Sequence, residues 1–138
     1  MRPLTSLLLP AALALAGCGG GPTYEVGGTS QAAGTDAVIT ADEIDGGNVE
    51  VTVDILHLPP PGRMGRGLTT YVVWFTAPEA PAQKAGVLDY DADDRRGRLR
   101  ATTPERRFEL RVTAERNRNV RSPSETVAVR QTVNVDED

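Results

Sequence analysis

The chain has 138 residues, with 15 lysines and arginines against 19 aspartates and glutamates, which gives a net charge of −4 at neutral pH. A chain of this length corresponds to one domain rather than several. The single cysteine and single histidine exclude an internal disulfide and leave too few ligands for a cysteine- or histidine-rich metal site.

The first 17 residues have the form of a bacterial export signal. Arg2 precedes the largely apolar stretch 4–16, which is too short to span a membrane permanently. The stretch ends in Leu15-Ala16-Gly17-Cys18, which resembles the lipobox of bacterial lipoproteins. This resemblance implies cleavage between Gly17 and Cys18 and lipidation of the Cys18 thiol, with acyl chains such as palmitate holding the protein in the membrane. An ordinary signal peptide that is cut elsewhere is the alternative.

The segment after the predicted signal indicates where the protein is held. Gly19 stands where many Gram-negative lipoproteins carry the aspartate that retains them at the inner membrane. We therefore expect anchoring in the cell envelope, at the outer rather than the inner membrane in a Gram-negative species. Residues 18–35 contain few large apolar side chains and are predicted to be a flexible tether, with the folded domain over residues 36–138.

Beyond residue 36 the dominant pattern is alternation of apolar and polar residues, which predicts half-buried β-strands. The clearest alternation covers residues 49–55, 108–113 and 127–135. Residues 69–76 are apolar at both alternating positions, as in a central strand that is covered on both faces. Shorter strands are predicted at 37–40, 86–90 and 98–102, between turns rich in Pro, Gly, Asp and Ser. About seven strands and no clear helix predict an all-β, immunoglobulin-like antiparallel β-sandwich.

Four short motifs add a family resemblance to this pattern. They are Tyr71-Val72-Val73-Trp74, Gly86-Val87-Leu88, the strand from Phe108 to Glu115, and Pro123-Ser124. Together they resemble the extracytoplasmic C-terminal domain of anti-sigma-K-type factors, over about residues 48–135. The resemblance implies a small sandwich with a role in sensing or interaction. The sigma-binding helices and the transmembrane helix of that family have no counterpart here, so sigma-factor binding is not implied.

An aspartate-rich segment is the strongest candidate for a metal site. Asp89, Asp91 and Asp93 have the spacing of the first ligands of a calcium loop. The match then fails, because Asp94 replaces the glycine of the loop and Arg100 replaces its bidentate glutamate. A solvated turn is the favoured interpretation and a calcium site the alternative.

No catalytic constellation is recognisable in the sequence. His57 has no second histidine or cysteine to join it and is interpreted as a strand-end residue with ordinary hydrogen bonds. Tyr71, Trp74 and Phe75 are interpreted as core residues rather than a sugar-stacking surface. We therefore predict a protein that is not an enzyme and carries no cofactor; a hydrolase is a third possibility behind the two functions below.

Arginine supplies nearly all of the positive charge. Residues 95–121 contain ten arginines and three glutamates. Arg98, Arg100, Arg107 and Arg111 occupy outward positions of predicted strands and are the candidate surface for an anionic partner, such as lipid headgroups, lipopolysaccharide phosphates or an acidic protein. The alternative is that these arginines are solvated strand positions paired with neighbouring acids.

These observations predict a lipid-anchored envelope lipoprotein that acts as a non-enzymatic interaction or structural module. Its expected partners are the membrane, through the lipid, and an anionic envelope component or another protein. Nucleic acid is not expected, because the protein is exported and its basic residues are not interleaved with aromatic ones. The alternative function is a sensory or ligand-binding domain for a small envelope molecule, a glycan or calcium.

Overall fold

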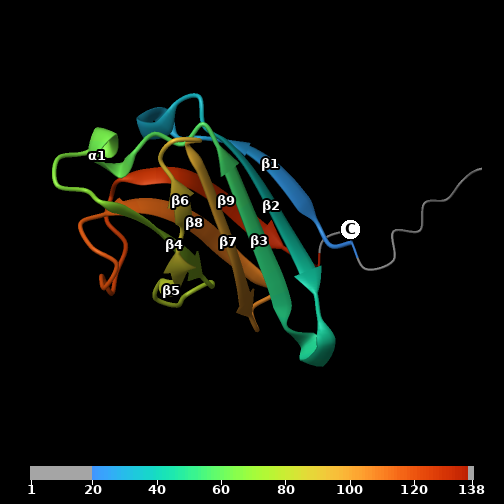
Figure 1. Ribbon diagram of the computed structural model, residues 1–138. Coiled ribbons are helices and arrows are strands. Elements are labelled where there is room, and N and C mark those ends of the chain that lie inside the picture. Colours follow the sequence, from blue (N-terminus) through green and yellow to red (C-terminus); the bar gives the residue numbers. More distant parts are fainter. Residues whose placement is uncertain (1–19, 137–138) are drawn as a thin grey trace, which may run out of the picture.

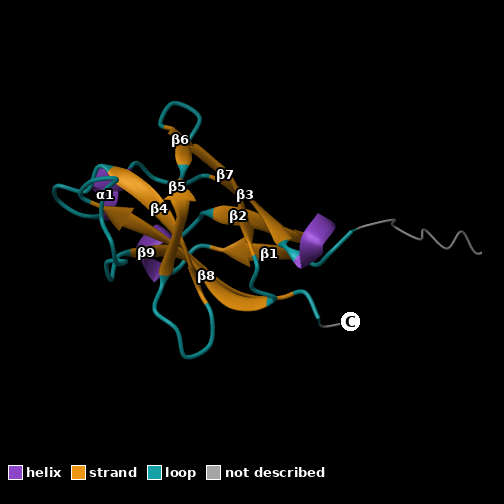
Figure 2. Ribbon diagram, turned by 90° about the horizontal axis from the view of Figure 1, so that it is seen from below, coloured by secondary structure: helices purple, strands orange, loops and turns teal. Residues whose placement is uncertain are grey.

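The computed structural model describes residues 20–136 (Figure 1). The predicted signal peptide and Cys18 therefore lie outside the described residues. Within residues 20–136, nine β-strands form two antiparallel sheets that pack face to face (Figures 1 and 2). No helix in this part of the chain is long and apolar enough to cross a membrane.

Sheet A has the strand order β1-β2-β3-β7-β6, and sheet B has the order β5-β4-β8-β9. The strands of sheet A are β1 (Thr23–Gly27), β2 (Asp36–Glu43), β3 (Val49–Leu56), β6 (Asp89–Asp91) and β7 (Arg96–Thr103). The strands of sheet B are β4 (Thr70–Thr76), β5 (Gln83–Val87), β8 (Arg107–Glu115) and β9 (Val127–Asn134). The short helical turns are η1 (Ser30–Ala32), η2 (Asp45–Gly47) and α1 (Pro61–Met64).

This strand order confirms the predicted immunoglobulin-like sandwich. The four strands β2-β3-β7-β6 correspond to the A-B-E-D sheet of that fold, and β5-β4-β8-β9 to its C′-C-F-G sheet. The strand β1 is an addition, paired antiparallel with β2 at the edge of sheet A. Nine strands rather than seven result, because β1 lies in the segment predicted as a tether and the predicted strand 86–90 covers parts of both β5 and β6.

The core follows the period of two that predicted the strands. In β3, Val49, Val51, Val53 and Ile55 are buried, while the residues between them are partly exposed. Central strand β4 is buried at both alternating positions, as predicted for residues 69–76. Its core-facing side chains pack against the residues of β3 and β8.

The predicted tether is corrected by the structure, because residues 23–35 belong to the domain. Tyr24 and Val26 of β1 pack against the core, and the hydroxyl of Tyr24 accepts a hydrogen bond from the backbone N–H of Asn134 in β9, at 3.0 Å. Ala32 and Thr35 are buried in the connection that follows. Small residues pack here because the backbones approach closely. A Cβ on Gly28 would lie 2.1 Å from the carbonyl oxygen of Ala32.

The antiparallel strands place the connections at two ends of the sandwich. The loop end holds the β1–β2, β3–β4, β6–β7 and β8–β9 connections, including α1. The terminal end holds Gly20, the β2–β3, β4–β5 and β7–β8 connections, and the C-terminal residues to Asp136. In Figures 1 and 2, α1 and the C-terminus lie at opposite ends of the molecule.

Candidate functional site

The four arginines predicted to form an anionic-partner surface do not lie on one surface. Arg98 and Arg100 belong to β7 in sheet A, whereas Arg107 and Arg111 belong to β8 in sheet B. The outward sides of two packed sheets face in opposite directions. The four candidate arginines therefore form two pairs on opposite outer faces, because β7 and β8 are adjacent in the sequence but belong to different sheets.

On sheet A the arginines face acidic residues of the neighbouring strand. The Nε atom of Arg98 lies 3.8 Å from Asp54 Oδ1, and that of Arg100 lies 3.8 Å from Glu50 Oε1. Arg96 binds the Asp54 carboxylate with two hydrogen bonds, at 3.0 and 2.7 Å. These hydrogen bonds lower the pKa of Asp54, and the charges of Arg96 and Arg98 lower it further. Positive charge on this face is thus largely compensated.

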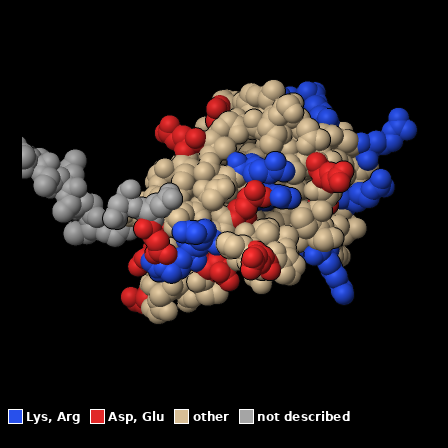
Figure 3. All heavy atoms as spheres, turned by 180° about the vertical axis from the view of Figure 1, so that it is seen from behind, with Lys and Arg blue, Asp and Glu red and all other residues tan. Residues whose placement is uncertain are grey.

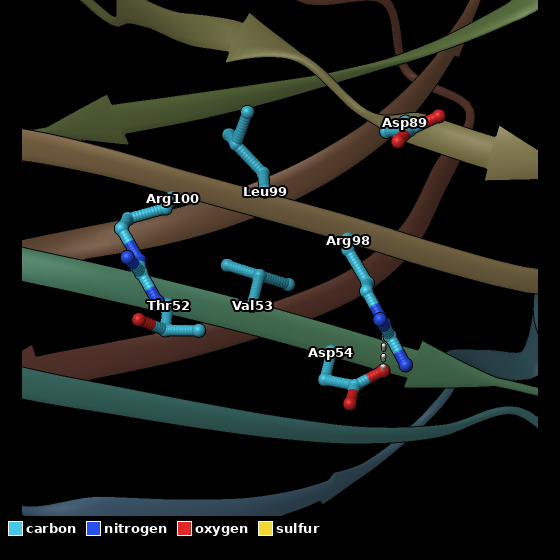
Figure 4. Close-up of a pocket in the computed structure, with 7 residues that line it drawn as sticks. All are labelled: Thr52, Val53, Asp54, Asp89, Arg98, Leu99 and Arg100. Carbon is cyan, nitrogen blue, oxygen red and sulfur yellow. Dashed lines mark ion pairs between the residues drawn. The ribbon is translucent and has the colours of Figure 1, made fainter.

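A shallow groove of about 570 Å³ runs over the same face, between β3 and β7. Figure 4 shows Arg98 and Arg100 extending from β7 toward β3, where Arg98 meets Asp54. Thr52 and Asp89 add further polar groups to the lining. The groove therefore offers both charge signs to a ligand rather than a purely basic surface.

On sheet B, Arg111 forms an ion pair with Glu109 of its own strand. Arg130 of β9 approaches the same carboxylate, at 3.9 Å. Arg107 is exposed and has no ion pair within residues 20–136. Of the four predicted arginines, only Arg107 is thus available without displacing an acid.

Five further arginines without an ion pair among the described residues lie in two connections at the loop end. We call these residues the arginine loop cluster: Arg63 and Arg66 of the β3–β4 connection, and Arg116, Arg118 and Arg121 of the β8–β9 connection. All five side chains are exposed, and none forms an ion pair with another described residue. Figure 3 shows lysine and arginine side chains projecting from this end of the molecule. The two connections that carry these five arginines contain one acidic residue, Glu125.

Hydrogen bonds join the two connections that carry the cluster. The hydroxyl of Thr69 donates to the carbonyl oxygen of Arg116 at 2.7 Å, and the Thr69 N–H donates to the carbonyl oxygen of Glu115 at 2.9 Å. The ammonium group of Lys84 in β5 donates to the carbonyl oxygen of Arg118 at 2.7 Å. Lys84 thereby adds a sixth cation beside the cluster.

Two tyrosines hold the β3–β4 connection in place. The hydroxyl of Tyr71 donates to the carbonyl oxygen of Pro59 at 2.5 Å, and that of Tyr90 donates to the carbonyl oxygen of Leu58 at 2.6 Å. The two rings meet edge to face, with centroids 5.4 Å apart. Burial raises the pKa of both hydroxyls, so both remain donors at neutral pH. Tyr71 thus has a role besides filling the core.

A buried polar network holds the start and the end of the β8–β9 connection. The indole N–H of Trp74 donates to the hydroxyl of Thr113 at 2.8 Å, and that hydroxyl donates to the Glu115 carboxylate at 2.5 Å. The same carboxylate oxygen accepts the backbone N–H of Ser124 at 2.9 Å. Trp74, Thr113 and Glu115 are all buried. Trp74 is therefore covered on the outer side of sheet B and does not form an exposed sugar-stacking surface.

The aspartates proposed as a weak calcium site do not converge. Asp89, Asp91 and Asp93 are all exposed, and Asp91 uses an oxygen to accept the backbone N–H groups of Asp93 and Asp94, at 2.9 and 3.3 Å. His57 pairs with a different acid, and its Nδ1 lies 3.0 Å from a carboxylate oxygen of Asp36. Within residues 20–136, no three His, Cys, Asp or Glu residues gather in the way a metal ion requires. Asp91 instead stabilises the β6–β7 turn through these two hydrogen bonds.

The arginine loop cluster could have been recognised from a signal in the sequence. Between residues 116 and 124 three arginines alternate with Asn, Val, Ser and Pro, with no acid among them. A strand can place an arginine opposite an acid of the next strand, but an irregular connection has no such register.

Comparison of the chain with protein families, with curated proteins and with solved structures finds no match.

Proposed function

We propose that the protein is a lipid-anchored protein of the cell envelope whose sandwich acts as a non-enzymatic interaction module. In this proposal the loop end is the contact surface. The observation that carries it is the placement of Thr23, the first residue of β1, and the arginine loop cluster at opposite ends of the sandwich.

The short distance along the chain from Cys18 to β1 supports this orientation. Five residues of chain lead from Cys18 to Thr23, the first residue of β1. Fully extended, five residues span at most about 18 Å. With a lipid on Cys18, the terminal end must stay near the membrane surface and the loop end would point away from it.

The chemistry of the cluster supports binding rather than catalysis. A guanidinium group stays protonated in proteins and offers five N–H donors in a fixed fork, so it binds anions but does not exchange protons at neutral pH. His57 lies beside Asp36 at the end of β3, and both side chains are largely exposed.

Replacing the lipidated residue tests the anchor. We expect the Cys18→Ser variant to leave the membrane fraction or remain unprocessed, and to lose incorporation of labelled palmitate. The Gly19→Ser variant is the control and should be processed and labelled like the wild type. Full labelling and membrane retention of Cys18→Ser would refute the anchor.

The orientation has its own test, in which a fluorophore is attached to a new cysteine in the lipidated protein on vesicles that contain a headgroup quencher. Asp45→Cys places the fluorophore at the terminal end, and Ser122→Cys places it in the β8–β9 connection; both positions are exposed. We expect strong quenching at position 45 and weak quenching at position 122. Equal quenching at the two positions would show that the loop end does not point away from the membrane.

A ligand-binding function is the second candidate, because the groove on sheet A presents Asp54, Arg98 and Arg100 together. A small envelope molecule or a glycan with both donors and acceptors suits this mixed lining. Arg98→Gln combined with Arg100→Gln should then abolish binding of such a ligand. If binding to envelope fragments depends on these two residues and not on the loop end, the groove is the functional site.

A further inference from the structure

We propose that the arginine loop cluster binds a linear polymer that carries phosphate groups along its length. The inference deepens the proposed interaction function and relies on it for the orientation on the membrane. Its chemical basis lies in the distribution of charge, the hydrogen-bonding capacity of the arginines and the shape of the loop end.

The charges of the connections differ in sign between the two ends. The charged residues of the loop-end connections are Arg63, Arg66, Arg95, Arg116, Arg118 and Arg121 against Asp93, Asp94 and Glu125. Those of the terminal-end connections are Asp45, Glu79, Glu105 and Asp136 against Arg106. A protein of net negative charge thus has one end that attracts polyanions and one end that repels them.

Phosphate is the anion that suits this surface best. Arginine presents paired N–H groups that match two oxygens of a phosphate, and such charge-assisted bonds are among the strongest in proteins. The five clustered arginines can bind without breaking an existing ion pair, whereas Arg98, Arg100 and Arg111 each lie near a carboxylate. An anion at the loop end therefore gains contacts that the folded protein does not already make.

A polymer suits the shape of the loop end better than a single small anion. The five arginines are exposed, and Arg118 lines a surface cavity beside Pro61, Thr69 and Tyr90. The other four arginines do not line this cavity, so it does not surround one ion with several guanidinium groups. Separate phosphates on one chain could each meet a different arginine, and linked contacts raise the overall affinity without any single strong site.

Hydrogen bonds hold both connections near their ends before any partner binds. Tyr71 and Tyr90 hold the start of the β3–β4 connection through the carbonyl oxygens of Pro59 and Leu58. Glu115 holds the β8–β9 connection through the N–H of Ser124. These anchors reduce the backbone ordering that binding would otherwise cost, which favours affinity.

The binding test uses the full chain in a non-ionic detergent and long-chain inorganic polyphosphate labelled with a fluorophore. The loop variant carries Arg116→Gln, Arg118→Gln and Arg121→Gln. The control variant carries Arg98→Gln, Arg100→Gln and Arg107→Gln, so that both variants lose three positive charges. All six positions are exposed, and thermal unfolding checks that both variants remain folded.

We expect wild type and the control variant to bind polyphosphate with similar affinity. The loop variant should bind at least tenfold more weakly, and its plot of log affinity against log salt should be shallower by about 3, or one unit for each lost phosphate contact. Poly-glutamate of the same length should compete poorly with polyphosphate.

Several results would overturn the inference. Equal losses in the two variants would mean that net charge alone governs binding, and equal competition by poly-glutamate would remove the preference for phosphate. Absence of wild-type binding, or binding only to vesicles of anionic lipid, would exclude a phosphate polymer as the partner. The anchor could still be present in each case, because the labelling of Cys18 is measured separately.

Discussion

The two ends of the sandwich hold their arginines in different ways. At the terminal end, Arg106 lies between Asp136 and Glu43 and forms ion pairs with both. Hydrogen bonds to these two carboxylates raise the pKa of Arg106. At the loop end, the arginine loop cluster has no such partners among residues 20–136. The number of arginines in a segment therefore does not measure how many are available for binding.

Arginines on the strands of sheet A are also paired with acidic residues, as Arg106 is at the terminal end. Asp54 of β3 lies directly opposite Arg98 of β7 in the antiparallel register, so an acid and a base meet on one face. Cross-strand pairs of opposite charge stabilise such a sheet. Residues 116–126 are not in a strand, and their arginines extend into solvent. Arginines on the paired strands of sheet A thus face acids, whereas the arginines of the β8–β9 connection have no ion pair among the described residues.

The largest expected effect comes from a core substitution that unfolds the whole sandwich and therefore disrupts both of its ends. Leu110 is fully buried in β8, and Leu110→Asp would place a carboxylate in the core without a partner, at a cost of several kcal/mol. We expect loss of the cooperative unfolding transition and of the strand signal in circular dichroism. Thr132→Asp, at an exposed position of β9, is the control and should unfold normally. Tolerance of Leu110→Asp would contradict the assignment of this residue to the core.

A smaller and more local effect is expected where the β8–β9 connection is held. Thr113→Val removes the acceptor of the Trp74 N–H and a donor to Glu115, and should lower the free energy of unfolding by about 1–3 kcal/mol. The same substitution at the more exposed Thr52, on the outer face of sheet A, should cost much less. Chemical denaturation measures both. Equal costs at the two sites would mean that the buried network contributes nothing specific.

One tyrosine hydroxyl at each end forms a hydrogen bond, so the same Tyr→Phe substitution compares how much stability each bond contributes. Tyr71→Phe removes the hydrogen bond to Pro59 at the loop end, and Tyr24→Phe removes the bond to Asn134 at the terminal end. Each should lower the free energy of unfolding by about 1 kcal/mol, the usual net worth of a hydrogen bond. Hydrogen exchange should accelerate in the β3–β4 connection for the first variant and around β1 and β9 for the second. Identical exchange patterns would show that the two ends do not open independently.

The smallest effect is expected from pH. The pKa values of Asp54 and Asp136 are lowered in the folded protein, chiefly by hydrogen bonds to Arg96 and Arg106. A lowered pKa contributes stability that is present above the unfolded pKa, about 3.9 for aspartate, and is lost as the pH falls through the folded value. Denaturation at neutral and acid pH should therefore show a modest loss below about pH 4. Arg106→Gln should reduce that loss, whereas Arg66→Gln should leave it unchanged.

The sequence predicted those features that depend on local pattern. Alternation in residues 49–55 corresponds to β3, and the doubly apolar stretch 69–76 corresponds to the buried strand β4. The prediction from sequence failed at β1, where composition suggested a tether but Tyr24 and Val26 pack against the core. A five-residue edge strand between glycine-rich segments gives a weak pattern, and its stability comes from pairing with β2 and contact with β9.

Fold class and the strand faces were determined by the sequence itself, because apolar residues at every second position must turn toward one core. Which arginines share a surface was decided only by the tertiary structure. The chain passes from sheet A to sheet B between β7 and β8, so Arg100 and Arg107 end on opposite outer faces. The return of the chain at the loop end brings Arg116 beside the β3–β4 connection, where a Cβ on Gly67 would lie 3.7 Å from the Arg116 guanidinium. Such neighbours depend on the order of strands in two sheets, and alternation along one strand carries no information about that order.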